Sequence, residues 1–256
     1  MTALQLASLA LICFLTSGIS VVTGSTSAIT VPAMFEFGLD PRTAVATNMF
    51  GLTFMSIGGT LPFLKSGALD RRRLPVLIVL TLFGSAIGAL LLLVMPKEVI
   101  PRFVSVCIIG LALFSTFYRQ TAAGDSLPVA NNTGYALTFL AGIYGGLFSG
   151  GYVTILTAIF VAAFRMSYLE AIATTKLVNV VSSGIATAIF LWQGLVDYRL
   201  GVVLAVAMFA GGVLGAKAAR RLAERWLKRI YLAAVYILGI KALLLDVGRP
   251  SPETSK

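Results

Sequence analysis

The stretch that decides the fold is Glu170-Ala-Ile-Ala-Thr-Thr-Lys-Leu-Val-Asn179, inside an apolar run that continues to about Trp192. An ionisable side chain at membrane depth costs roughly 2.5 kcal/mol or more, so Lys176 requires a partner or a function. Thr175, Lys176 and Asn179 share one face of a helix, because they lie three and four positions apart. This face offers ammonium, amide and hydroxyl groups without a carboxylate, which suits a small oxyanion.

A structural role for Lys176 is the alternative. Its ammonium group would then snorkel to the membrane surface or pair with a carboxylate such as Glu170. Glu170 lies six positions away, which is a poor spacing for a pair on one helix.

Composition places the chain in a membrane. Of its residues 58% are hydrophobic and only 12% are charged, with a mean hydropathy of +0.93, whereas soluble domains carry roughly 25% charged residues. The net charge is +10, but the positive residues cluster between apolar runs, which is typical of a membrane protein and not of a nucleic-acid-binding surface.

The chain lacks the residues of common catalytic and metal sites. It contains no histidine, which excludes Ser-His catalysis, Cys-His catalysis and most zinc sites. Cys13 and Cys107 lie in separate apolar runs and do not form a C-x-x-C motif. The sequence therefore predicts no metal, no cofactor and no enzymatic activity.

Ten apolar runs divide the chain. They cover residues 4–23, 28–37, 43–64, 74–95, 100–118, 134–149, 152–165, 169–192, 199–219 and 227–245. The first two are too short together for two comfortable spans of about 20 residues, so they form a re-entrant hairpin or two short, tilted helices. The polar stretch 119–133 is a linker, and 249–256 is a polar tail.

The second half of the chain repeats the first. A gapless shift of 127 positions aligns many identical small and polar residues, among them Gly18 with Gly145, Gly24 with Gly151, Thr30 with Thr157, Asp70 with Asp197, Gly84 with Gly211 and Gly88 with Gly215. Chance matches between apolar segments favour Leu, Val and Ala instead. We therefore expect two repeats, 1–118 and 134–248.

The positive loops orient these repeats. In the first repeat the positive loop is 65–73, whose counterpart around Asp197 is nearly neutral; in the second it is 217–229, whose counterpart 97–102 is weakly charged. The positive loop thus lies one connection later in the second repeat than in the first. Under the positive-inside rule this difference means that the repeats face opposite ways. We expect both termini outside the cell, with 65–73, 119–133 and 217–229 in the cytoplasm.

The predicted fold is therefore all-α: a polytopic membrane protein with two inverted-topology repeats. Each repeat comprises a broken or short helical hairpin and three longer transmembrane helices. This is the plan of secondary transporters, which bind their substrate near the midplane between the repeats.

Matching breaks rich in Gly, Ser and Thr occur at 23–27 and 149–154. In lipid a broken backbone is tolerated only where protein or a cavity covers it, and a helix beginning there points free N–H groups at an anion. The candidate substrate-binding residues at the breaks are Gly24, Ser25, Thr26, Gly150, Gly151 and Thr154. Close helix packing through small residues is the alternative.

Polar residues also match between the long runs that follow the breaks. Thr47-Asn48 aligns with Thr174-Thr175, and these four residues join Lys176 and Asn179 as binding candidates. Met49 and Leu52 occupy the positions equivalent to Lys176 and Asn179. The repeat is thus symmetric in pattern but asymmetric in charge, and a single cation suits an anionic substrate.

With these motifs in place, the chain resembles the sulfite exporter TauE/SafE family of membrane permeases over nearly its whole length. The resemblance rests on Val31-Pro32, Gly38-Leu-Asp-Pro41, Ala44, Thr47, Ala171-Ile-Ala-Thr-Thr-Lys-Leu-Val-Asn179 and Ser182-Ser183. It implies transport of sulfite, sulfonates or related small organic anions. The break Val21-Val-Thr-Gly-Ser-Thr26 carries fewer glycines than the family usually has there.

The predicted function is export of a small oxyanion across the inner membrane of a cell. The expected partners are the anionic substrate and the lipid bilayer, without nucleic acid; homo-oligomerisation is left open. An importer of an organic anion, coupled to protons or sodium, is the first alternative. An intramembrane enzyme is a second, disfavoured because histidine, H-E-x-x-H and G-x-S-x-G are absent.

Overall fold

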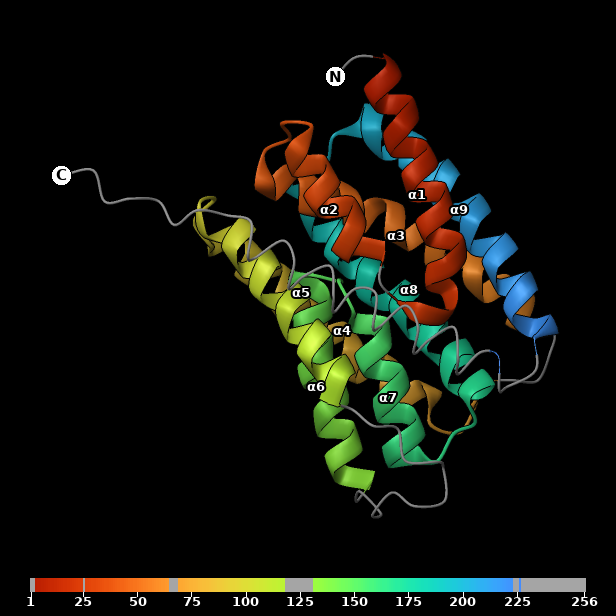
Figure 1. The fold of residues 1–256 in the computed structure, drawn as a ribbon. Coiled ribbons are helices and arrows are strands. Elements are labelled where there is room, and N and C mark those ends of the chain that lie inside the picture. The colour runs from red at the N-terminus through yellow and green to blue at the C-terminus, as the bar shows by residue number, and fades with distance from the viewer. Residues whose placement is uncertain (1–2, 25, 65–68, 118–130, 223–225, 227–256) are drawn as a thin grey trace.

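In the computed structural model, the described residues are 3–24, 26–64, 69–117, 131–222 and 226, and they form nine α-helices without strands (Figure 1). The helices are α1 (Ala3–Thr23), α2 (Thr26–Glu36), α3 (Pro41–Leu64), α4 (Leu74–Val94), α5 (Val99–Phe117), α6 (Asn131–Leu147), α7 (Tyr152–Phe164), α8 (Tyr168–Trp192) and α9 (Tyr198–Arg221). The predicted all-α class is confirmed. Helix α6 begins inside the expected linker 119–133. Most of that linker, the run 227–245 and the tail 249–256 lie outside the described residues.

Five helices of the described chain have the length and apolar composition needed to cross a membrane. They are α1, α3, α4, α8 and α9. Helices α2 and α7, with 11 and 13 residues, are too short to span. The polytopic membrane architecture is thereby confirmed, and each predicted hairpin contains one short helix.

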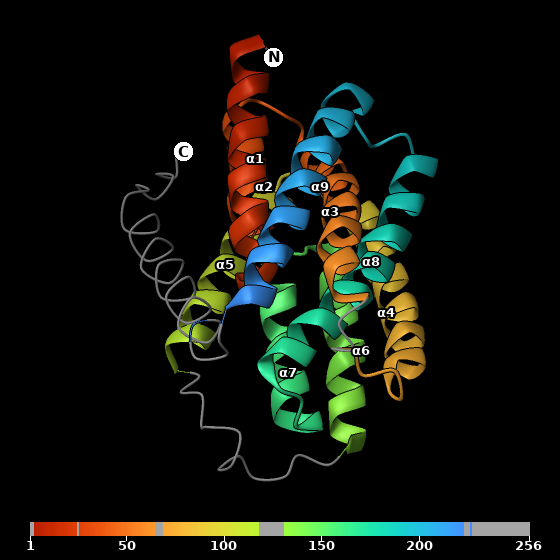
Figure 2. The same ribbon diagram turned by 90° about the vertical axis from the view of Figure 1, so that its right-hand side faces the viewer.

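The short helices belong to two V-shaped hairpins. Helices α1 and α2 meet at Gly24, and α6 and α7 meet at 148–151 (Figures 1 and 2). In Figure 1 the first V opens toward the top of the view and the second toward the bottom, so their apices lie inside the molecule.

Helix boundaries follow the sequence repeat. The first four helices and helices α6 to α9 begin and end within three residues of a shift of 127. The repeat-related residues Asp40 and Ser167 cap the long helices: Asp40 Oδ2 accepts from Thr43 N at 3.3 Å, and Ser167 forms a capping box with Glu170. Local capping chemistry therefore sets equivalent helix starts in both halves.

Glycines let helices from different halves approach closely. A Cβ atom at Gly88 of α4 would lie 2.0 Å from the Ile143 carbonyl oxygen of α6. One at Gly215 of α9 would lie 2.1 Å from the Gly18 carbonyl oxygen of α1. Gly88 and Gly215 are repeat-related, so the same small residue brings α4 to α6 and α9 to α1, as is usual for helix pairs in membranes.

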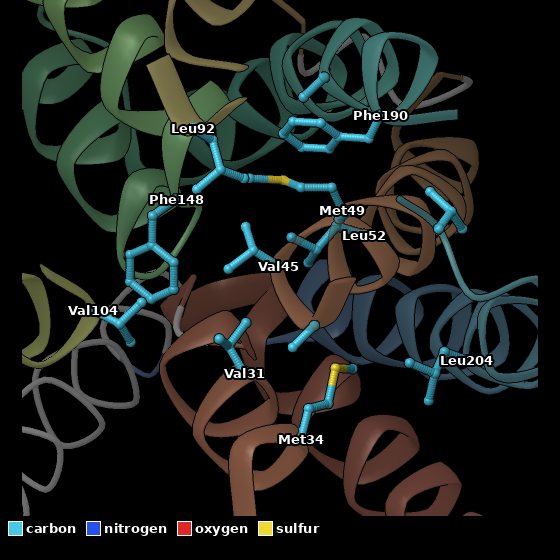
Figure 3. Close-up of a cluster of buried hydrophobic side chains, with 14 of the residues drawn as sticks. Val31, Met34, Val45, Met49, Leu52, Leu92, Val104, Phe148, Phe190 and Leu204 are labelled. Atoms are coloured by element: carbon cyan, nitrogen blue, oxygen red, sulfur yellow. The ribbon is translucent and has the colours of Figure 1, made fainter. Parts of the chain in front are cut away.

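A cluster of buried hydrophobic side chains fills the space around α3 (Figure 3). It joins Val45, Met49 and Leu52 of α3 to residues of α2, α4, α5, α8 and α9. Phe148, at the apex of the second V, packs in this cluster next to Phe103, with ring centroids 6.4 Å apart. The cluster thus holds the break of the second half against the long helices of the first.

The close helix contacts give a direct stability prediction. Gly88→Ala or Gly215→Ala places a methyl group on a backbone carbonyl, and overpacking of this kind costs about 1–3 kcal/mol. We expect either variant to unfold at a lower temperature than the wild type in detergent, measured by the loss of the monodisperse peak after heating.

Gly110→Ala is the matched control, because a Cβ atom at Gly110 of α5 meets no atom of the described residues within 4 Å. Its unfolding temperature should be unchanged or slightly higher, since alanine favours helix. Equal destabilisation by all three substitutions would contradict a specific role for the α4–α6 and α1–α9 contacts.

Candidate functional site

The apices of the two V-shaped hairpins touch each other. Gly24 and Gly151, which the repeat aligns, both adopt left-handed backbone conformations with φ of 71° and 81°. A Cβ atom at Gly24 would lie 2.6 Å from Val153 Cβ and 2.7 Å from Thr154 N. The N-termini of α2 and α7 therefore meet at one point inside the molecule, where the positive ends of both helix dipoles favour negative charge.

A small cavity lies at this junction. It has a volume of about 10 Å³ and is lined by Gly24, Thr26, Ser27, Leu52, Met55, Ser149, Val153, Lys176 and Asn179. Both breaks and both long helices α3 and α8 contribute to it. This volume is about the minimum for one water molecule, so the walls must separate before a larger anion enters.

Lys176 is fully buried at the cavity. Its Nζ donates to the Ser20 carbonyl oxygen at 3.1 Å, and the same oxygen accepts from Gly24 N at 2.8 Å. Ser20 lies in the last turn of α1, where the negative end of the helix dipole partly compensates the ammonium charge.

No carboxylate of the described residues pairs with this ammonium group. In the described part of the chain the ion pairs are Arg73–Asp70 and Lys97–Asp40. Glu170 is instead held in the capping box of α8 with Ser167. Both structural alternatives for Lys176, snorkelling to the surface and pairing with Glu170, are therefore wrong.

Asn179 lines the cavity one helical turn after Thr175. Asn179 Nδ2 donates to Ser56 Oγ of α3 at 2.7 Å, which joins α8 to α3. Among the described residues, Asn179 Oδ1 and Thr175 Oγ1 are buried without a hydrogen-bond partner. Unpaired buried polar atoms are uncommon in proteins, and here one of them belongs to the wall of the cavity.

Thr47 and Thr174 lie away from the cavity lining. Thr47 Oγ1 accepts from Asp197 N at 3.0 Å, and Thr174 Oγ1 accepts from Asp70 N at 3.3 Å. Both pairs join residues of opposite halves, and the shift of 127 converts one pair into the other. These threonines tie a long helix of one half to a loop of the other.

Asp70 and Asp40 are the acidic residues of the loops near α4 and α3. Partial burial opposes their ionisation, but hydrogen bonds and charge from Arg73 hold the pKa of Asp70 below its usual value. Lys97 lowers the pKa of Asp40 in the same way, against partial burial. Both carboxylates are thus ionised anchors at neutral pH and poor proton carriers.

The remaining candidates surround the cavity without lining it. Asn48 is bonded to Ser27 and Thr30. The Gly150 carbonyl oxygen accepts from the Tyr144 hydroxyl group, Gly151 begins α7, and Thr154 follows in its first turn. Ser25 lies outside the described residues.

Four of the residues that the sequence named as binding candidates line the cavity: Gly24, Thr26, Lys176 and Asn179. Sequence reasoning missed Met55 and Ser149, as well as Ser20 and Ser56, which bind Lys176 and Asn179. The one available signal was the match of Ser56 with Ser183 in the repeat.

Comparison with known proteins agrees with this architecture. The family model described as "Sulfite exporter TauE/SafE" matches residues 9–242. The "Probable membrane transporter protein ORF9" of Sinorhizobium sp. is 27% identical over 241 residues, which cover 93% of this chain and 91% of that protein. A "Probable membrane transporter protein" of Haemophilus influenzae is 26% identical over 206 residues, 80% of this chain and 81% of that protein.

The "Probable membrane transporter protein YfcA" of Escherichia coli K12 is 23% identical over 228 residues, 87% of this chain and 83% of that protein. No solved structure matches the chain significantly. Five potential membrane-spanning helices, a family match over most of the chain and relatives described as transporters lead to one conclusion. The protein is a multi-pass membrane transporter that belongs to the sulfite exporter TauE/SafE family.

Proposed function

We propose that the protein exports a small oxyanion, sulfite, a sulfonate or a related sulfur-containing organic anion, across the inner membrane. The anion binds between the two breaks, with Lys176 as its counter-charge. The single observation that carries the proposal is the burial of Lys176 beside the cavity without a carboxylate partner in the described chain.

The buried ammonium group of Lys176 lacks a compensating charge in the described chain. A buried ammonium group retains a large desolvation penalty unless an opposite charge lies next to it. The Ser20 carbonyl oxygen supplies only a dipole. An anion in the adjoining cavity supplies the missing charge, so its binding is favoured by the penalty that Lys176 already bears.

Hydroxyl groups at the cavity provide further donors. The Thr26 hydroxyl points to the sulfur of Met55 at 3.4 Å, a weak acceptor that an anion readily replaces. Ser27 Oγ accepts from Asn48 at 2.8 Å, which leaves its own proton to donate. Together with the N-termini of α2 and α7, these groups complement the oxygens of an oxyanion.

Two observations support the inverted arrangement of the repeats. The V-shaped hairpins open toward opposite ends of the molecule (Figure 1). The symmetric contacts Thr47–Asp197 and Thr174–Asp70 place each half against the same part of the other. Inverted repeats around a central site are the arrangement that gives alternating access, because each half can rock against the other.

The membrane potential favours the outward direction. An anion that leaves a negative interior gains roughly 2.3 kcal/mol per charge per 100 mV, so export needs no coupled ion. The absence of histidine and the exposure of Glu36 at the end of α2 leave little to form a proton relay. Because the sequence contains no histidine, we also infer that the protein is not an enzyme.

The inverted topology can be tested with one matched pair of cysteines. Arg72 and Arg199 are repeat-related and both exposed, next to the starts of α4 and α9. In a protein with Cys13 and Cys107 replaced by alanine, an impermeant thiol reagent added to intact cells should label Arg199→Cys. Arg72→Cys should react only after permeabilisation, because the positive loop 65–73 is cytoplasmic.

Labelling of both cysteines from the same side would contradict the inversion. Labelling of Arg72→Cys alone in intact cells would show that the repeats are inverted but that the protein has the opposite orientation in the membrane.

The binding role of Lys176 predicts an effect on affinity. Lys176→Gln keeps a hydrogen-bond donor but removes the charge, and loss of one partner of a buried charge pair costs about 2–5 kcal/mol. We expect the half-saturating sulfite concentration in proteoliposomes to rise by about 30-fold or more. Lys176→Arg retains the charge and should change it much less.

Lys217→Gln removes an exposed charge near the end of α9 and serves as the control, with an unchanged half-saturating concentration. Wild-type affinity in the Lys176→Gln variant would remove Lys176 from the site. Sulfite, sulfonates and carboxylates, compared in the same vesicles, identify the preferred class of anion.

The driving force is tested with the same vesicles at equal pH on both sides. Anion efflux should accelerate with an imposed potassium–valinomycin potential, negative inside, and should not require sodium. Flux that ignores the potential and follows a proton or sodium gradient would instead indicate the alternative, a coupled importer of an organic anion.

A further inference from the structure

The two short helices are attached to their neighbours in different ways. In the first half, Asn48 of α3 bridges two hydroxyl groups of α2. Asn48 Nδ2 donates to Ser27 Oγ at 2.8 Å, and Thr30 Oγ1 donates to Asn48 Oδ1 at 2.6 Å. All three side chains are buried. The amide thus uses a donor and an acceptor to fix α2 to α3 next to the cavity, because Ser27 lines it.

The second half lacks this bridge. The residues related to Asn48 and Thr30 are Thr175 and Thr157. Their hydroxyl groups are buried and have no hydrogen-bond partner in the described part of the chain. A threonine side chain is one atom shorter than asparagine, and Thr175 Oγ1 reaches no hydroxyl group of α7 in the described part of the chain.

The end of α7 differs from that of α2 as well. Helix α2 is followed by Gly38, whose φ of 80° suits glycine; at the related position after α7 stands Arg165, with φ of 55°. Arg165 is the one non-glycine residue with positive φ in the described chain. A side chain in this conformation is strained, which is a frequent property of segments that switch between two arrangements.

We propose that Asn48 is a positioning residue that fixes α2 to α3, and that α7, without an equivalent bridge, is the wall of the cavity that moves to admit the substrate. The assignment of α7 as a gate rests on the proposed function. Val153 of α7 and Ser149 before it line the cavity. Movement of α7 along α8 therefore enlarges the space of about 10 Å³, while Ser27 and Thr26 stay in place.

The difference between the helices is measured without any substrate. In the full-length protein in nanodiscs, the backbone amides of α7 should exchange with deuterium about tenfold faster than those of α2, since α7 lacks the amide bridge that joins α2 to α3. Thr175→Asn supplies the missing amide. It should slow exchange in α7 about tenfold, and it should lower the turnover of sulfite efflux.

Asn48→Thr is the reciprocal variant and keeps the test decisive if Thr175→Asn does not fold. It gives the first half the residue of the second, so exchange in α2 should rise to the level of α7. Equal exchange of α2 and α7 in the wild type would overturn the proposal, as would unchanged exchange in both variants.

Exchange rates do not depend on the identity of the anion. If α7 exchanges faster than α2 but Lys176→Gln binds the anion with unaltered affinity, Lys176 is not the binding residue. The proposal that α7 moves would still stand. The converse pattern, a loss of affinity in Lys176→Gln with equal exchange in α2 and α7, would overturn the mobile helix alone.

Discussion

The hydrogen bond from Lys176 to the Ser20 carbonyl oxygen is the interaction on which the rest of the structure depends. It brings the one fully buried charge of the described chain to the last turn of α1, at the junction of both breaks. Three features surround this ammonium group: the C-terminal end of α1, which partly neutralises it, the N-termini of α2 and α7, and the cavity beside it. In the proposed function, an anion in the cavity would supply the compensating charge that this site lacks.

The duplication explains how a single chain of 256 residues builds such a junction. Each half contributes one break and one long helix, and glycines at related positions bring the halves together. The two halves differ at their polar positions. Lys176 and Asn179 in the second half replace Met49 and Leu52 of the first, whereas Asn48 in the first replaces Thr175 of the second. One half therefore carries the charge and the other the rigid attachment.

Much of this was predictable from the sequence. Apolar runs and capping residues predicted the helices, and Gly24 and Gly151 marked both breaks, because membrane length and backbone chemistry act locally. Contacts across the halves were not predictable. Thr47 and Thr174 share a pattern with the binding candidates, yet they hold loops, and Ser20 reaches Lys176 from 156 residues away. Spacing along one helix does not encode which distant helix it meets.

The most direct measurement is a crystal structure of the protein with selenite, a sulfite analogue whose selenium gives an anomalous signal. We expect one selenium peak between the two breaks, with a selenite oxygen at about 2.7–3.2 Å from Lys176 Nζ. Lys176 should then have turned from the Ser20 carbonyl oxygen toward the anion. A selenium peak elsewhere, with Lys176 still bound to Ser20, would contradict the central claim.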